Sequence, residues 1–220
     1  HVGAMKMISD GSLNTRSAYC STPYSGITPE TYGTLSYTPE QIESYMRLAA
    51  EHGFDIACHA IGDEANTIVL DCAERTHAHG SIEHAQMLKE CDIPRLARLG
   101  LAASIQPQHA MDDRDVITRF WGNPAGIPYA FNSLHKSGTK LLMGSDAPVA
   151  PLDPWLAISA AVFGTESSDR EPFQPEQCLE FETALASSTA LGRTTLQAGD
   201  AADLVLLDCD PSELESPEAM

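Results

Sequence analysis

The sequence predicts an α/β fold in which parallel strands form part of a TIM-like (β/α)8 barrel. Apolar runs of strand length alternate with stretches whose apolar residues recur at helical spacing, which is typical of β-α units around a parallel sheet. Polar residues suited to chemistry follow these runs at their C-terminal ends, where barrels of this kind build their active sites. About five strands are expected where a full barrel has about eight, so the predicted barrel is incomplete.

The clearest β-α unit begins at Thr38. A helix over 39–52 is predicted because Thr38 is a favourable N-cap, a proline follows it, and Gln41 completes a capping box. The apolar run 54–58 then forms a strand that delivers His59 to its C-terminal end.

The same alternation continues toward residue 146. Further strands are expected over 4–8, 81–83, 101–105 and 140–143, and further helices over 65–76, 94–99 and 128–137. Residues 106–127 are rich in Asp, Gly and Pro, so we expect a long loop there. Residues 202–208 form an apolar run after a Gly-Asp turn and are expected to be a separate β segment.

Composition excludes several classes of partner. The chain has 13 Lys and Arg residues against 31 Asp and Glu, a net charge of −18 that opposes binding to nucleic acid or to anionic lipid. No apolar run approaches the roughly 18 residues that a membrane span needs. The six cysteines are scattered without a Cys-x-x-Cys pair, which indicates reduced thiols and a cytoplasmic setting.

Three residues at matching strand ends suggest a metal site: His59, His84 and Asp146. A barrel would point all three side chains into one mouth, where imidazole and carboxylate groups are common ligands of zinc. A single histidine at a strand end is more often a hydrogen-bonded structural residue. Three in successive units favour a site for a divalent metal.

Lys6 is unusual because it lies inside the apolar run 4–8. Either its ammonium group reaches water at the strand end, or the lysine is carboxylated and bridges two metal ions as an anion. The sequence alone leaves both readings open.

Four stretches, at residues 5–13, 58–63, 82–86 and 144–148, carry a resemblance to a known family. Together, and in the family's order, they resemble the amidohydrolase superfamily, and more narrowly its amidohydrolase-3 branch, which includes N-substituted formamide deformylases. A fifth, at 199–207, resembles the segment that returns the chain to a small β-sandwich beside the barrel. The resemblance therefore extends over nearly the whole chain.

This resemblance implies roles for four residues. Lys6 would be the carboxylated lysine that bridges two metals, and His59 and His84 would be ligands from the fifth and sixth barrel strands. Asp146, from the eighth strand, would be both a metal ligand and the general base. The implied cofactor is one or two divalent ions, with Zn²⁺ expected.

Four further residues are expected near the same mouth, where they would bind or orient substrate: Arg16, Asp63, Gln106 and His109. Three of the four also fit a plainer role. Asp63 also fits a helix cap, His109 a solvated ring, and Arg16 a surface arginine.

One feature departs from the family pattern. The superfamily carries a His-x-His pair on its first barrel strand, whereas the His77-x-His79 pair of this chain ends a predicted helix. We therefore expect a C-terminal fragment, with a partial metal-dependent hydrolase barrel over 1–190 and a β segment of the sandwich over 191–220. Such a fragment would associate into oligomers through open strand edges, bind fewer than two zinc ions and hydrolyse slowly or not at all.

The function that these observations favour is hydrolysis of a non-peptide carbon–nitrogen bond in a small amide-type substrate by metal-activated water. Two alternatives stay open. The chain could be a catalytically incomplete binding remnant, or it could derive from a deaminase of cyclic amidines that uses one metal and an uncarboxylated Lys6.

Overall fold

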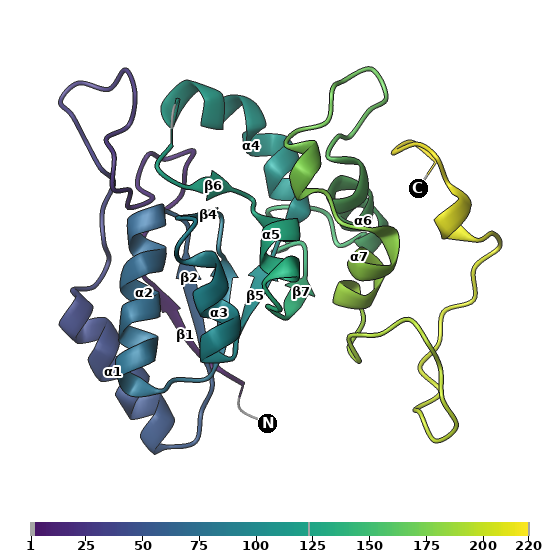
Figure 1. The fold of residues 1–220 in the computed structure, drawn as a ribbon, viewed down its shortest axis with the longest axis horizontal. Coiled ribbons are helices and arrows are strands. Elements are labelled where there is room, and N and C mark those ends of the chain that lie inside the picture. The colour runs from purple at the N-terminus through teal and green to yellow at the C-terminus, as the bar shows by residue number, and fades with distance from the viewer. Residues whose placement is uncertain (1–2, 123, 220) are drawn as a thin grey trace.

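The computed structural model describes residues 3–122 and 124–219, and its centre is a five-stranded parallel sheet (Figure 1). The strands are β1 (Met5–Ile8), β2 (Ile56–Ala60), β3 (Gly80–His84), β5 (Leu101–Ile105) and β7 (Leu141–Met143). They lie in the order β1-β2-β3-β5-β7, each parallel to its neighbour. Parallel strands that follow one another in chain order form the wall of a (β/α) barrel, so the predicted fold class is confirmed.

Seven α-helices connect and flank these strands in the described residues. They are α1 (Pro39–Glu51), α2 (Asp63–Thr76), α3 (Ile93–Leu99), α4 (Pro107–Phe120), α5 (Phe131–Lys136), α6 (Pro154–Phe163) and α7 (Phe181–Ser188). Two short 3₁₀ turns occur at Pro175–Gln177 and Pro211–Glu213, and β4 (Met87–Leu88) pairs antiparallel with β6 (Ile127–Pro128). In the part of the chain that the structure describes, no helix is long and apolar enough to cross a membrane.

The first helix begins where the local sequence signals predicted. The backbone N–H of Gln41 donates to Thr38 Oγ1 at 3.4 Å, and the backbone N–H of Thr38 donates to Gln41 Oε1 at 2.9 Å. This reciprocal pair satisfies two N–H groups that have no partner inside the helix. The capping box is therefore confirmed.

The two faces of the sheet differ in polarity. One set of alternate strand residues is buried in the core on the side of the helices: Met7, Cys58, Ile82 and Ala103. Figure 1 shows α1, α2 and α3 on that side of the sheet. Lys6, His59 and Glu83 occupy the intervening positions, point to the opposite face and remain partly exposed. The polar candidates thus share the face that would line a barrel.

The prediction of a loop over 106–127 is wrong, because most of this segment is helix α4. Pro107 stands at the first helical position after Gln106, which is a favourable place for proline. The buried residues Ala110, Ile117 and Phe120 recur at helical spacing. Composition concealed this periodicity, because the polar face of the helix is rich in aspartate.

The predicted β segment at 202–208 is not a strand in this structure. Val205 is 84% exposed and Leu206 is 97% exposed. A strand needs a neighbouring ladder to satisfy its backbone groups, and none of the described strands pairs with this segment. The division of the chain near residue 190 therefore stays a prediction.

Candidate metal centre

Three histidine rings lie side by side where the strands end. His59 comes from β2, His84 is the last residue of β3, and His109 lies in the first turn of α4, directly after β5. The ring centroids of His59 and His84 are 4.6 Å apart, with the planes at 73°. Those of His84 and His109 are 5.8 Å apart and nearly parallel, at 18°. The rings therefore converge although they are distant in sequence.

Asp146 joins two of these histidines. One potential ligand atom from each of His84, His109 and Asp146 lies within 4.8 Å of the others. The carboxylate is exposed, whereas Nδ1 of His84 and Nε2 of His109 are buried and have no hydrogen-bond partner among the described residues. Buried ring nitrogens normally have a partner, so this donor set suits a divalent ion.

An unusual backbone turn aims the His84 ring. In a regular strand His84 would point to the same side as Ile82, which is buried in the core. Instead His84 has a φ of 73° and Ala85 a φ of 43°, so two consecutive residues lie in the left-handed region. Each such residue costs on the order of 1–2 kcal/mol. The turn brings the His84 ring to the face that carries His59.

The environment of His84 keeps its ring neutral. Burial lowers the pKa of His84 to about 3, and the charges of His59, His109 and Lys6 act in the same direction. A protonated ring has no free lone pair, whereas a neutral one offers a nitrogen to a metal. At neutral pH the ring is therefore in the form that binds metal.

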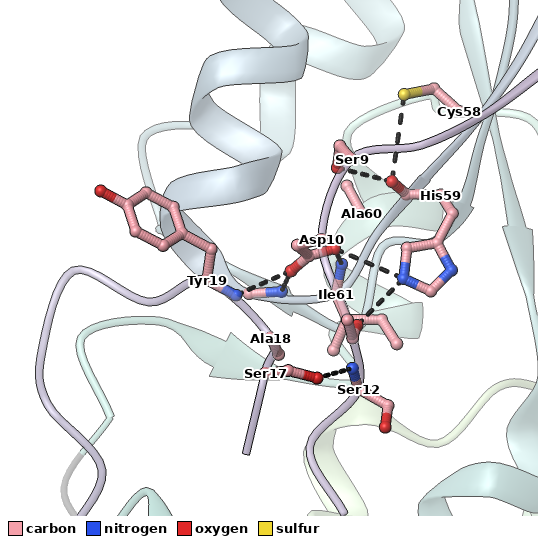
Figure 2. Close-up of polar contacts among 12 residues, drawn as sticks. Ser9, Asp10, Ser12, Ser17, Ala18, Tyr19, Cys58, His59, Ala60 and Ile61 are labelled. Atoms are coloured by element: carbon pink, nitrogen blue, oxygen red, sulfur yellow. Dashed lines mark hydrogen bonds and ion pairs between the residues drawn. The ribbon is translucent and has the colours of Figure 1, made fainter. Parts of the chain in front are cut away.

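Asp10, which the sequence reading did not single out, anchors the chain at the mouth (Figure 2). Its side chain is almost fully buried, and it accepts hydrogen bonds from the backbone N–H groups of Tyr19 at 2.9 Å, Gly62 at 2.9 Å and Ile61 at 3.1 Å. These donors belong to two segments far apart in sequence. The carboxylate thus joins the loop after β1 to the end of β2.

The same carboxylate lies beside the His59 ring. Nε2 of His59 is 3.4 Å from Asp10 Oδ1 and 3.0 Å from the backbone oxygen of Gly11, as Figure 2 shows. A carbonyl oxygen only accepts, so this nitrogen carries a proton and Nδ1 is left for another partner. A carboxylate behind a histidine is a common way to orient a metal ligand. The available sequence signal was an aspartate two residues after the first apolar strand.

Lys6 lies on the same face of the sheet as His59. Lys6 pairs with Ala57 of β2, which lies two residues before His59 and therefore on the same face, and the Lys6 side chain is exposed. Its charge contributes to the lowered pKa of His84. The structure thus places Lys6 on the predicted side of the sheet, and its carboxylation stays a prediction.

Arg16 and Asp63 contact loop and helix residues. The Arg16 guanidinium lies 5.5 Å from the centroid of the Phe120 ring. Asp63 is completely buried, and its carboxylate accepts from the Ser21 backbone N–H at 3.0 Å and from the Ser21 hydroxyl. Gly62, not Asp63, is the N-cap of α2. A substrate would reach Asp63 only after the Ser21 loop moved away.

Gln106 and His109 lie on either side of the start of α4. Gln106 is the N-cap residue, is 6% exposed, and donates from Nε2 to the backbone oxygen of Ser104 at 3.1 Å. The backbone N–H of His109 donates to the backbone oxygen of Gln106 at 3.0 Å. This turn fixes the position of the His109 ring, and both residues lie at the mouth where they were predicted.

Known proteins that resemble this chain include members of the amidohydrolase family. The model of the amidohydrolase family matches residues 1–219. The chain is 32% identical, over 94% of its length, to the protein LONG AFTER FAR-RED 3 of Arabidopsis thaliana. It is 31% identical, over 97% of its length, to the putative amidohydrolase YtcJ of Bacillus subtilis strain 168. The chain spans 38% and 43% of the lengths of these two relatives.

A solved structure shares the fold. The crystal structure of an uncharacterized metal-dependent hydrolase from Pyrococcus furiosus superposes with a TM-score of 0.82 and 29% sequence identity. The match covers 96% of this chain and 45% of that one. The similarity therefore includes the sheet and the strand ends that carry the histidines.

Proposed function

The chain belongs to the amidohydrolase family, and from this premise we propose that the protein containing it hydrolyses a non-peptide carbon–nitrogen bond with the help of a divalent metal. The substrate would be a small amide-type molecule. N-substituted formamides are the first class to test, because the stretches at 5–13, 58–63, 82–86 and 144–148 resemble the branch that includes their deformylases.

One observation carries this proposal. His84 and Asp146 bring ligand atoms together at the C-terminal ends of parallel strands, and Nδ1 of His84 is buried without a partner. In a purely structural cluster, a buried ring nitrogen would be expected to hydrogen-bond. Nitrogen and carboxylate donors suit zinc, which we propose as the metal.

The chemistry needs few groups. A bound divalent ion would polarise a substrate carbonyl group and lower the pKa of a water molecule beside it. The carboxylate of Asp146, which is exposed, would accept the proton that this water loses when it attacks the carbonyl carbon. The Nε2 of His59 donates to the backbone oxygen of Gly11, which leaves Nδ1 with a lone pair that could bind an ion. Carboxylation of Lys6 would add an anionic group able to bridge to a second ion.

A cytoplasmic location is part of the proposal. All six cysteines lie in the described residues and are unpaired. Disulfides are rare in the reducing cytosol and common outside it, so six unpaired cysteines fit that compartment.

The test is a comparison of the metal-free and zinc-loaded natural protein against formamides, N-acyl amino acids, cyclic ureas and esters. We expect amide-type hydrolysis only with metal. Asp146→Asn should lower turnover by ~10²–10⁴-fold, because it removes a proton acceptor. Asp153→Asn is the matched control, since this aspartate caps α6 outside the cluster and asparagine caps equally well. Hydrolysis that persists without metal, or in Asp146→Asn, would contradict the proposal.

A further inference from the structure

We infer that His109 is a metal ligand, so that His84, His109 and Asp146 together hold one ion. This inference rests on the proposed function and goes beyond it. The resemblance in the sequence implied Lys6, His59, His84 and Asp146 as metal ligands, whereas His109 was expected only to bind or orient substrate. The structure assigns the first turn of α4 to the metal site itself.

His109 has an unpaired ring nitrogen at the site. Nε2 of this ring is buried and has no hydrogen-bond partner among residues 3–122 and 124–219. The ring lies parallel to the His84 ring, which also has a buried, unpaired nitrogen. A buried ring nitrogen without a partner is costly, and this site has one in each of two neighbouring rings, so a cation or donor groups would be needed to satisfy them.

The set of donors suits a zinc ion. Two imidazoles and a carboxylate, with their ligand atoms within 4.8 Å of one another, match the three protein ligands of many catalytic zinc sites. Such sites leave a fourth position for water or substrate. The two histidines are half-buried and Asp146 is exposed, so the cluster opens to solvent on its carboxylate side.

A buried hydrogen-bond network holds helix α4 in place. Asp113 lies one turn after His109 on α4, and its buried carboxylate accepts from Gln86 Nε2 at 2.6 Å and from the Tyr129 hydroxyl at 2.8 Å. Gln86 follows His84 by two residues. The network therefore ties the helix that carries His109 to the left-handed turn that carries His84. Fixing both ring positions in advance is what a metal site requires.

A second contact extends this network to the loop after β1. Asn14 Nδ2 donates to the other carboxylate oxygen of Asp113 at 2.6 Å. The backbone N–H of Tyr129 also donates to the backbone oxygen of Gln86 at 2.6 Å. Three separate segments thus fix α4 against the sheet end, and none of these contacts uses the nitrogens of His84 or His109.

The experiment measures metal binding directly. The metal-free protein is titrated with Co²⁺ and followed by visible absorption, and Zn²⁺ affinity is measured by competition. His109→Gln should weaken zinc binding by more than about 100-fold, because even residues that only support a ligand typically contribute about 10–100-fold. His135→Gln is the control, since this histidine is exposed on α5, and it should bind as the wild type does.

A second variant decides the matter if His109→Gln is poorly folded. His109→Cys replaces the ring by a thiolate, which can still bind the ion. It should give a sulfur-to-cobalt charge-transfer band in the near ultraviolet that the wild type lacks, and such a band arises only from direct coordination. Circular dichroism before and after metal addition checks that the fold is retained.

The outcomes separate this inference from the proposed function. Wild-type zinc affinity in His109→Gln, together with no new band in His109→Cys, overturns the role of His109. If His84→Gln and Asp146→Asn still lose the ion in that case, the metal-dependent function stands. If the wild-type protein takes up no ion at all, both proposals fall.

Discussion

Replacing Asp10 by asparagine should destabilise the protein strongly, although the side chain hardly changes in size. Asp10 is 1% exposed and lies between the loop after β1 and the end of β2. Its Oδ2 accepts from Tyr19 and Gly62, and its Oδ1 accepts from Ile61. Asparagine has only one acceptor oxygen, and its NH₂ group would face backbone N–H donors.

The size of this loss of stability depends on which of two orientations the new side-chain amide adopts, and the better one sets the estimate. If the amide oxygen keeps the two bonds to Tyr19 and Gly62, the NH₂ group faces the Ile61 N–H and one charge-assisted hydrogen bond is lost. A hydrogen bond to a charged group contributes about 1.5–3 kcal/mol, and the two that remain become weaker neutral bonds. Relief of the desolvation cost of the buried carboxylate offsets part of this loss. We expect the free energy of unfolding to fall by about 2–4 kcal/mol.

The assay is urea unfolding followed by circular dichroism. Asp55→Asn is the matched control, because this exposed aspartate directly precedes β2, and it should change stability by less than about 0.5 kcal/mol. Trypsin should also cleave faster after Arg16 in Asp10→Asn, since the loop has lost its anchor. An Asp10→Asn protein as stable as the control would show that the carboxylate is not what joins the loop to β2.

Two further predictions test the fold. At pH 8 the exposed thiol of Cys91 should react with iodoacetamide, whereas Cys58 should react only after unfolding. Burial raises the pKa of Cys58 to about 12, so this thiol has almost no thiolate form at pH 8. Equal labelling of both cysteines in the native protein would contradict the assignment of Cys58 to the core. Gly80→Ala should lower the free energy of unfolding by about 2–4 kcal/mol in a urea titration, because at a φ of 130° the new Cβ would lie 2.0 Å from a backbone oxygen of β2. Gly53 has a φ of 71° and open space around it, so Gly53→Ala should lower the free energy of unfolding by only about 1 kcal/mol. Similar losses of stability at the two positions would refute this reasoning.

The elements that the sequence predicted well are those with local signals. The capping box at Thr38 and Gln41 determines the start of α1 from four consecutive residues, and the structure reproduces it. Alternation of apolar strands and amphipathic helices predicted the parallel sheet, because each unit must bury its own apolar face. The placement of His59 and His84 at the ends of neighbouring strands followed from the sheet, since parallel strands end at one edge. The convergence of the two rings also needs the left-handed turn at His84, which the sequence did not indicate.

The features that could not be predicted from the sequence depend on contacts between distant segments. Asp10 is a structural anchor only because backbone donors from the loop at Tyr19 and from the end of β2 meet it. His109 seemed to lie in a loop because the aspartates of α4 concealed the helical period. Residues 202–208 show the opposite error, because their β propensity has no neighbouring strand to satisfy it.

Metal binding at this site is tested most directly by X-ray diffraction at the zinc absorption edge from crystals of the protein grown with Zn²⁺. The prediction is an anomalous peak at the C-terminal ends of the strands, roughly 2.0–2.2 Å from a ring nitrogen of His84 and from a carboxylate oxygen of Asp146. A structure with zinc bound at other residues, and none between His84 and Asp146, would contradict it.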